Sequence, residues 1–126
     1  MTKYVLIMLG GALGAGSRFA VGTFVARFYT AVFPLATFLI NVSGSFLIGL
    51  LMMLFLYRST ISANWRLFLV TGILGGYTTF SSFEWETFFA IRSGASPVAI
   101  LYVLLSVVLG LVAAWLGALL AVRLWA

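Results

Sequence analysis

The fold depends on residues 72–83, which read GILGGYTTFSSF and lie at the centre of a long apolar segment. Gly75 and Gly76 are adjacent, and the threonines and serines that follow compete for backbone hydrogen bonds, so this stretch forms a poor continuous helix. Unpaired backbone groups at membrane depth are tolerated only where protein buries them or where they line a site. We therefore predict a broken helix. A continuous helix kinked at the glycines is the alternative.

The composition places this segment in a membrane. Of the 126 residues, 64% are hydrophobic and 7% are charged, whereas a soluble domain has roughly a quarter of its residues charged. No charge occurs between Arg27 and Arg58 or between Arg92 and Arg123. Each gap exceeds the ~20 apolar residues that a transmembrane helix needs. A soluble protein is excluded.

The hydropathy pattern predicts an all-α integral membrane protein with one four-helix transmembrane domain over residues 1–126. The expected spans cover about residues 3–28, 34–57, 65–91 and 97–125. The first is too long for the apolar part of a signal peptide, so we expect a retained helix. The connecting loops are too short for a soluble domain, which places any function inside the membrane. We expect a multi-pass protein of the cell (inner) membrane, in contact with lipid.

The positive charges favour neither orientation strongly. One side is expected to carry Lys3, Arg58, Arg66 and Arg123, and the other Arg27 and Arg92, with Arg18 nearer to the second. Orientation follows such differences, and this one is small. Both orientations can therefore insert, which would permit an antiparallel, dual-topology homodimer. A protein with both termini inside is the alternative. No basic cluster supports binding of nucleic acid.

Three spans carry stripes of small or polar residues at a spacing of four, which places each stripe on one helix face. The stripes are Gly10, Gly14, Arg18 and Gly22; Thr37, Asn41, Ser45 and Gly49; and Tyr102, Ser106, Gly110, with Gly117 and Ala121. Small residues allow close helix packing in lipid, and packing alone is sufficient to explain the glycines. The polar members need a partner or water at membrane depth, and this favours a functional role.

The polar groups available in the membrane suit a small anion. No Asp or Glu precedes Glu84, and cation pathways usually contain acidic residues. The donors are Asn41, Thr78, Thr79, Ser81, Ser82, Tyr102 and Ser106. The rings of Phe80 and Phe83 share a helix face and have electropositive edges that can stabilise an anion. A lipid-facing position of these rings is the alternative. Glu84 and Glu86 are expected near the interface, where either can cap or gate a pore mouth.

The sequence resembles the Fluc (CrcB-type) fluoride channels. The resemblance rests on GGYTTFSSF at residues 75–83 with Glu86, GALGAGSR ending at Arg18, and NVSGSFLIG at residues 41–49. It covers the whole chain, and the motif of the third span is its most specific part. Tyr77 and Ser82 depart mildly from the family pattern, although Ser82 keeps a hydroxyl.

The resemblance implies an antiparallel homodimer with two passive, fluoride-selective pores. Phe80 and Phe83 would line the pores, Asn41 would donate a hydrogen bond to the ion, and Tyr102 and Ser106 would form a polar track. Thr79, Ser81 and Ser82 would contribute further pore hydroxyls, with Arg18 and Glu86 at a vestibule. A structural sodium ion would lie at the dimer centre, bound by the backbone carbonyls of Gly75 and Thr78.

Other functions fit the sequence less well. A small multidrug-type cation exporter shares the four short spans but depends on a glutamate in its first helix, where this chain has Arg18. A non-transporting assembly subunit would explain the glycine stripes but not the hydroxyl-rich break. An enzyme is not expected, because the chain has no cysteine or histidine and no buried acid–base pair.

Overall fold

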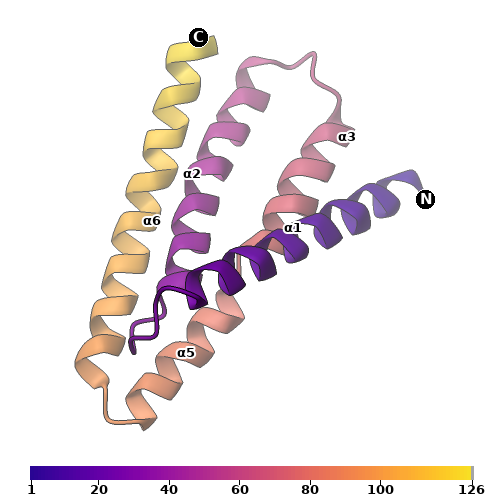
Figure 1. Cartoon of the computed structure of the whole chain (residues 1–126). Helices are drawn as coiled ribbons and strands as arrows, with labels where there is room; N and C mark the ends of the chain where they lie inside the picture. The colour runs from indigo at the N-terminus through magenta and orange to yellow at the C-terminus, as the bar shows by residue number, and fades with distance from the viewer. Residues whose placement is uncertain (126) are drawn as a thin grey trace.

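The computed structural model describes residues 1–125, and these form helices joined by short connections (Figure 1). The helices are α1 (Thr2–Ala26), α2 (Leu35–Tyr57), α3 (Ala63–Arg66), the π-helix η1 (Leu67–Leu74), α4 (Gly75–Tyr77), α5 (Phe80–Arg92) and α6 (Ser96–Trp125). Gly94 has a φ of 83° in the turn that joins α5 to α6, a conformation that favours glycine. The described residues contain no strand.

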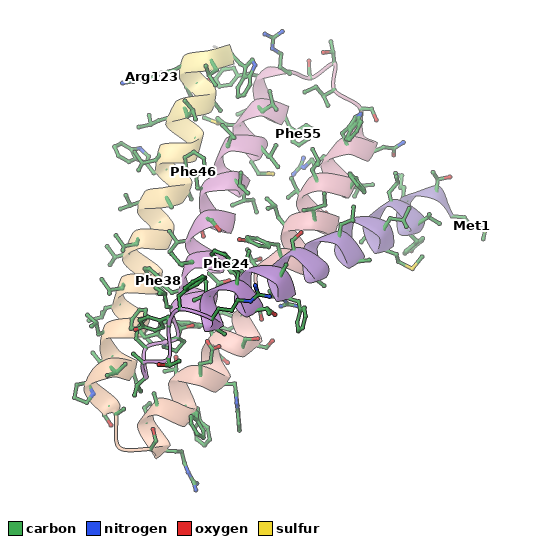
Figure 2. The ribbon with its side chains drawn as sticks, viewed as in Figure 1. Met1, Phe24, Phe38, Phe46, Phe55 and Arg123 are labelled. Atoms are coloured by element: carbon green, nitrogen blue, oxygen red, sulfur yellow. The ribbon has the colours of Figure 1, made fainter. Side chains whose placement is uncertain are left out.

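Helices α2 and α6 lie side by side along most of their lengths (Figure 1). Two glycines permit this close approach. A Cβ atom on Gly49 would collide with the Ala114 carbonyl of α6, and one on Gly117 would collide with the Phe46 carbonyl of α2. Figure 2 shows Phe46 at the middle of this pair, between Phe38 and Phe55 at the two ends of α2. Gly49 of the second-span stripe and Gly117 of the fourth-span stripe therefore act as packing positions, as predicted.

Helix α1 crosses obliquely in front of the segment that contains α3, η1 and α4 (Figure 1). At the crossing, a Cβ on Gly10 would lie 2.5 Å from the Phe68 carbonyl oxygen, and one on Gly14 would collide with that of Ile73. Gly16 and Gly22 have open space where a side chain would project. The packing seam predicted for the first span therefore includes Gly10 and Gly14 but not Gly22.

Two residues in extended conformation separate α4 from α5. Thr78 has a ψ of 156°, and Thr79 has φ and ψ of −149° and 118°. The helical path therefore stops at Tyr77 and restarts at Phe80. We call residues 78–79 the interruption. The π-helix η1 precedes it, and such wider turns occur frequently at functional sites.

Three of these helices, α1, α2 and α6, are long and apolar enough to cross a membrane. Their bounds lie within about two residues of the corresponding predicted spans. Pro34, the first residue of the second predicted span, is the N-cap of α2, which begins at Leu35. Helices α3 to α5 together occupy the region of the remaining predicted span. Many large apolar side chains are exposed, as expected of a surface that lipid covers. The protein is a multi-pass membrane protein.

Candidate functional site

A groove of about 400 Å³ lies beside the interruption, where α2, η1, α5 and α6 meet. Its lining consists of apolar side chains, small residues and neutral polar groups. These residues are Asn41, Gly44, Ser45, Ile48, Val70, Leu74, Gly75, Thr78, Thr79, Phe80, Phe83, Ser106 and Val107. The lining includes no acidic residue. Neutral donors on an apolar wall suit an anion better than a cation.

Asn41 holds the interruption in place. Its side-chain amide donates to the Thr79 carbonyl at 3.0 Å, and its Oδ1 accepts from the Thr79 backbone N–H at 2.9 Å. In a continuous helix that N–H would donate to the Gly75 carbonyl four residues earlier. Asn41 therefore replaces the helical partner of the extended backbone, and one of its two amide hydrogens remains for another acceptor. The sequence pointed to Asn41 as a donor but not to this backbone pairing.

The hydroxyl groups around the interruption differ in the hydrogen bonds that they already make. Thr78 Oγ1 donates to the Leu74 carbonyl at 2.9 Å. Thr79 Oγ1 accepts from the Ser82 backbone N–H at 3.2 Å, which caps α5, and donates to Ser82 Oγ at 3.0 Å. Ser82 can therefore still donate its own hydroxyl hydrogen. The exposed Ser81 hydroxyl lies 3.5 Å from Thr79 Oγ1.

Phe80 and Phe83 lie on one side of α5 next to these hydroxyls, as their spacing predicted. Their ring centroids are 5.9 Å apart. Phe80 is 70% exposed at the groove, whereas Phe83 is half-buried and its ring centroid lies 5.0 Å from that of Tyr102. Tyr102 also packs edge-to-face against Phe33 at 5.4 Å. The aromatic residues therefore form a continuous row from the groove to the bundle interior.

The carboxylate of Glu86 lies inside the bundle, where hydroxyl groups from two helices bind it. Thr37 of α2 donates to its Oε1 at 2.7 Å, and the fully buried Tyr102 of α6 donates to its Oε2 at 2.8 Å. Glu86 is half-buried, whereas Glu84 is exposed. Thr37 was not among the predicted site residues. A signal existed, because the start of the second span and the end of the third must lie on the same side.

The remaining predicted residues fall into two groups. Ser106 and Gly75 line the groove, and the buried Ser106 Oγ has no hydrogen-bond partner within residues 1–125. Arg18 does not line the groove; it is half-buried on α1, one turn beyond Gly14. Of the predicted pore residues, Asn41, Thr79, Phe80, Phe83 and Ser106 line the groove together. Tyr102 packs against Phe83, and Ser81 and Ser82 lie between Phe80 and Phe83 in the first turn of α5 without lining the groove.

Comparison with known proteins gives a consistent result over nearly the whole chain. Residues 5–118 match the sequence model of the family described as CrcB-like protein, Camphor Resistance (CrcB). A relative from Solibacter usitatus (strain Ellin6076), named fluoride-specific ion channel FluC, is 52% identical over 121 residues, covering 96% of this chain and 99% of the relative. A protein of the same name from Thermus thermophilus is 45% identical over 117 residues, covering 93% of each chain.

Proposed function

The chain belongs to the CrcB-like family, and from this premise we propose that it is one half of a passive, fluoride-selective channel with two pores in an antiparallel homodimer. The curated relatives are named as fluoride-specific channels, and no enzyme activity is proposed. The observation that carries the proposal is the groove, in which neutral donors and two phenylalanine rings meet without an acidic group. A small multidrug-type cation exporter requires an acidic group, and the lining of this groove contains none.

We assign fluoride to the row of donors along this groove. Ser106 Oγ is buried without a hydrogen-bond partner among residues 1–125, which is costly unless a ligand or water supplies one. Asn41 retains one amide hydrogen, and the rings of Phe80 and Phe83 border the same space. Ring edges and hydroxyl hydrogens all present positive partial charge. Together they can replace part of the hydration shell of an anion while the apolar wall excludes water.

The groove also supports the dimer. A single protomer leaves the groove open, with Phe80 and Gly75 exposed. Extended backbone at membrane depth must be covered by protein or line a cavity. A second, inverted copy would place its own interruption against this one across a twofold axis. In this arrangement α3, η1, α4 and α5 form the third, broken span, and each pore has walls from both protomers.

The backbone at the interruption fits a structural sodium ion held at the dimer centre. The Gly75 carbonyl loses its usual helical donor because the Thr79 N–H donates to Asn41. Gly75 and Thr78 both border the groove, and carbonyl oxygens suit a hard monovalent cation. Residues 1–125 contain no cluster of His, Cys, Asp or Glu that could hold a metal, so backbone oxygens are the donors we assign. The ion would bind the two protomers together without taking part in conduction.

Fluoride efflux from liposomes tests the function. Protein reconstituted into vesicles should release fluoride down its gradient, with chloride retained, as measured by ion-selective electrodes. Phe83→Ile removes the ring that bridges the groove and Tyr102, so efflux should fall by at least about 10². Phe89→Ile is the matched control, because Phe89 lies on the same helix, is 61% exposed and does not border the groove. A wild-type protein that releases no more fluoride than empty vesicles would disprove the function.

A further inference from the structure

A second hollow lies away from the groove, between the first half of α1 and the segment formed by α3 and η1. It has a volume of about 390 Å³ and is lined by Leu6, Ser62, Asn64, Trp65 and Phe68. Leu6 and Phe68 are apolar, Ser62 and Asn64 are polar, and Trp65 has an apolar ring with a single donor. This lining matches a molecule with a polar head and an apolar tail.

The charge around this hollow is entirely positive. Lys3 lies three residues before Leu6 and therefore on nearly the same face of α1. Arg58 and Arg66 flank the loop and helix that carry the polar lining residues. The two acidic residues of the chain, Glu84 and Glu86, both lie in α5, beyond the interruption. Within residues 1–125, no acidic side chain of α1, α3 or η1 offsets these cations, so the hollow should attract an anion.

The polar side of the hollow has donors available for that anion. Ser62 Oγ accepts the Asn64 backbone N–H at 3.1 Å, and its hydroxyl hydrogen remains able to donate. Trp65 is 57% exposed, and its ring lies edge-to-face against Phe68 with a centroid distance of 6.1 Å. Exposed tryptophan is characteristic of the level at which lipid headgroups meet hydrocarbon. We therefore expect the hollow to lie near the level of the lipid headgroups.

We propose that this hollow binds one anionic phospholipid of the surrounding membrane. Its phosphate would lie among Lys3, Ser62 and Asn64, and one acyl chain would pack against Leu6 and Phe68. Basic residues near a membrane surface attract anionic lipids, whereas free phosphate would leave the apolar lining unused. The site is separate from the groove, so lipid binding does not depend on which ion the groove conducts.

Native mass spectrometry of the purified full-length protein tests this site with two lipid probes. The protein should bind phosphatidylglycerol more tightly than zwitterionic phosphatidylcholine. Lys3→Gln should weaken phosphatidylglycerol binding about fivefold, the effect of one basic residue. Arg123→Gln is the matched control, because Arg123 lies at the end of α6 close to the same end of the bundle, outside the hollow (Figure 2). It should bind this lipid like the wild type.

Leu6→Trp tests the acyl part of the site, because it fills the hollow and leaves every charge in place. This variant should lose selective phosphatidylglycerol binding while keeping wild-type helicity by circular dichroism; if it does not fold, the smaller Leu6→Phe replaces it. Equal binding of the two lipids by the wild type would overturn the proposal. So would Arg123→Gln weakening phosphatidylglycerol binding as much as Lys3→Gln, because attraction would then be a general property of this end of the bundle.

Discussion

At the scale of single residues, the site depends on side chains that satisfy backbone as well as on those that face the groove. Asn41 pairs with both backbone groups of Thr79, and Thr79 in turn caps α5 through its hydroxyl. A side chain with one donor and one acceptor is required for the first of these contacts. The geometry of the interruption therefore depends on a residue 38 positions away in the sequence.

Replacement of Asn41 by alanine should destabilise the protein and disturb the interruption. Both Thr79 backbone groups would lose their partners, and each unsatisfied buried group costs about 1–3 kcal/mol. We expect a loss of about 2 kcal/mol or more, measured by unfolding of the detergent-solubilised protein, together with reduced fluoride efflux. Asn64→Ala is the control, because Asn64 is exposed and its side chain has no role in the interruption. Equal stability of the two variants would contradict the assigned role of Asn41.

The two donors to Glu86 should be energetically coupled. Thr37→Val and Tyr102→Phe each remove one hydrogen bond to the same carboxylate, at a cost of about 1.5–3 kcal/mol for a bond to a charged group. Because they share an acceptor, the double variant should deviate from additivity by at least about 0.5 kcal/mol. A double-mutant cycle of unfolding free energies measures this coupling. Strict additivity would show that the two hydroxyls act independently.

The sequence predicted the residues of the site better than their contacts. Residue type and spacing pointed to three donors and two rings, namely Asn41, Thr79, Ser106, Phe80 and Phe83. Donors without nearby acids, and aromatic residues within a polar run, can both be recognised in a sequence. The partners of Asn41 and Glu86 were not predicted. These contacts depend on the rotation and depth of one helix against another, which periodicity within a single helix does not determine.

At the scale of elements, glycines set the distances between helices. The stripes in the sequence predicted helix faces, and close approach occurs at Gly10, Gly14, Gly49 and Gly117. Gly22 has the same spacing, but a Cβ atom added there would meet no other part of the described residues within 4 Å. A stripe identifies a possible face of contact, but the oblique crossing of α1 brings only part of that face against η1 and α4. The crossing angle depends on several helices together, so the sequence of one helix could not predict it.

Two alanine substitutions on α1 should separate packing from helix propensity. In Gly14→Ala the new methyl group would collide with the Ile73 backbone, and the overpacking should cost about 1–3 kcal/mol. Gly16→Ala adds the same methyl group in open space and should be neutral or slightly stabilising. Thermal unfolding in one detergent compares the two. A Gly16→Ala variant as unstable as Gly14→Ala would show that the α1 crossing is not the cause.

At the scale of the whole molecule, the cations are divided between the two ends without a strong bias. This division was read from the sequence, and it underlies the proposed inverted dimer. Every connection between successive helices is short, so each reversal of chain direction is made by a short loop and not by a separate domain. Because residues 78–79 separate α4 from α5, only α1, α2 and α6 within residues 1–125 are each long and apolar enough to cross a membrane.

Single cysteines can test the orientation directly, because the chain contains none of its own. Ser59→Cys and Ser93→Cys place a thiol in the exposed α2–α3 and α5–α6 connections. With dual topology, a membrane-impermeant maleimide should label about half of each variant in sealed cells and the rest after permeabilisation. Complete labelling of one position and none of the other would establish a single orientation. Proteins with known fixed orientation provide the control.

The open groove has a consequence for how much channel a cell can make. In the proposed antiparallel dimer, a protomer inserted one way is incomplete until it meets a protomer inserted the other way, because Gly75 and Phe80 at its groove remain exposed. The number of channels would then be limited by whichever orientation is rarer, and the surplus protomers would have no partner. A mutation that adds one lysine to a loop would thus lower the number of channels without altering a pore residue, because it would make the two orientations unequal in number.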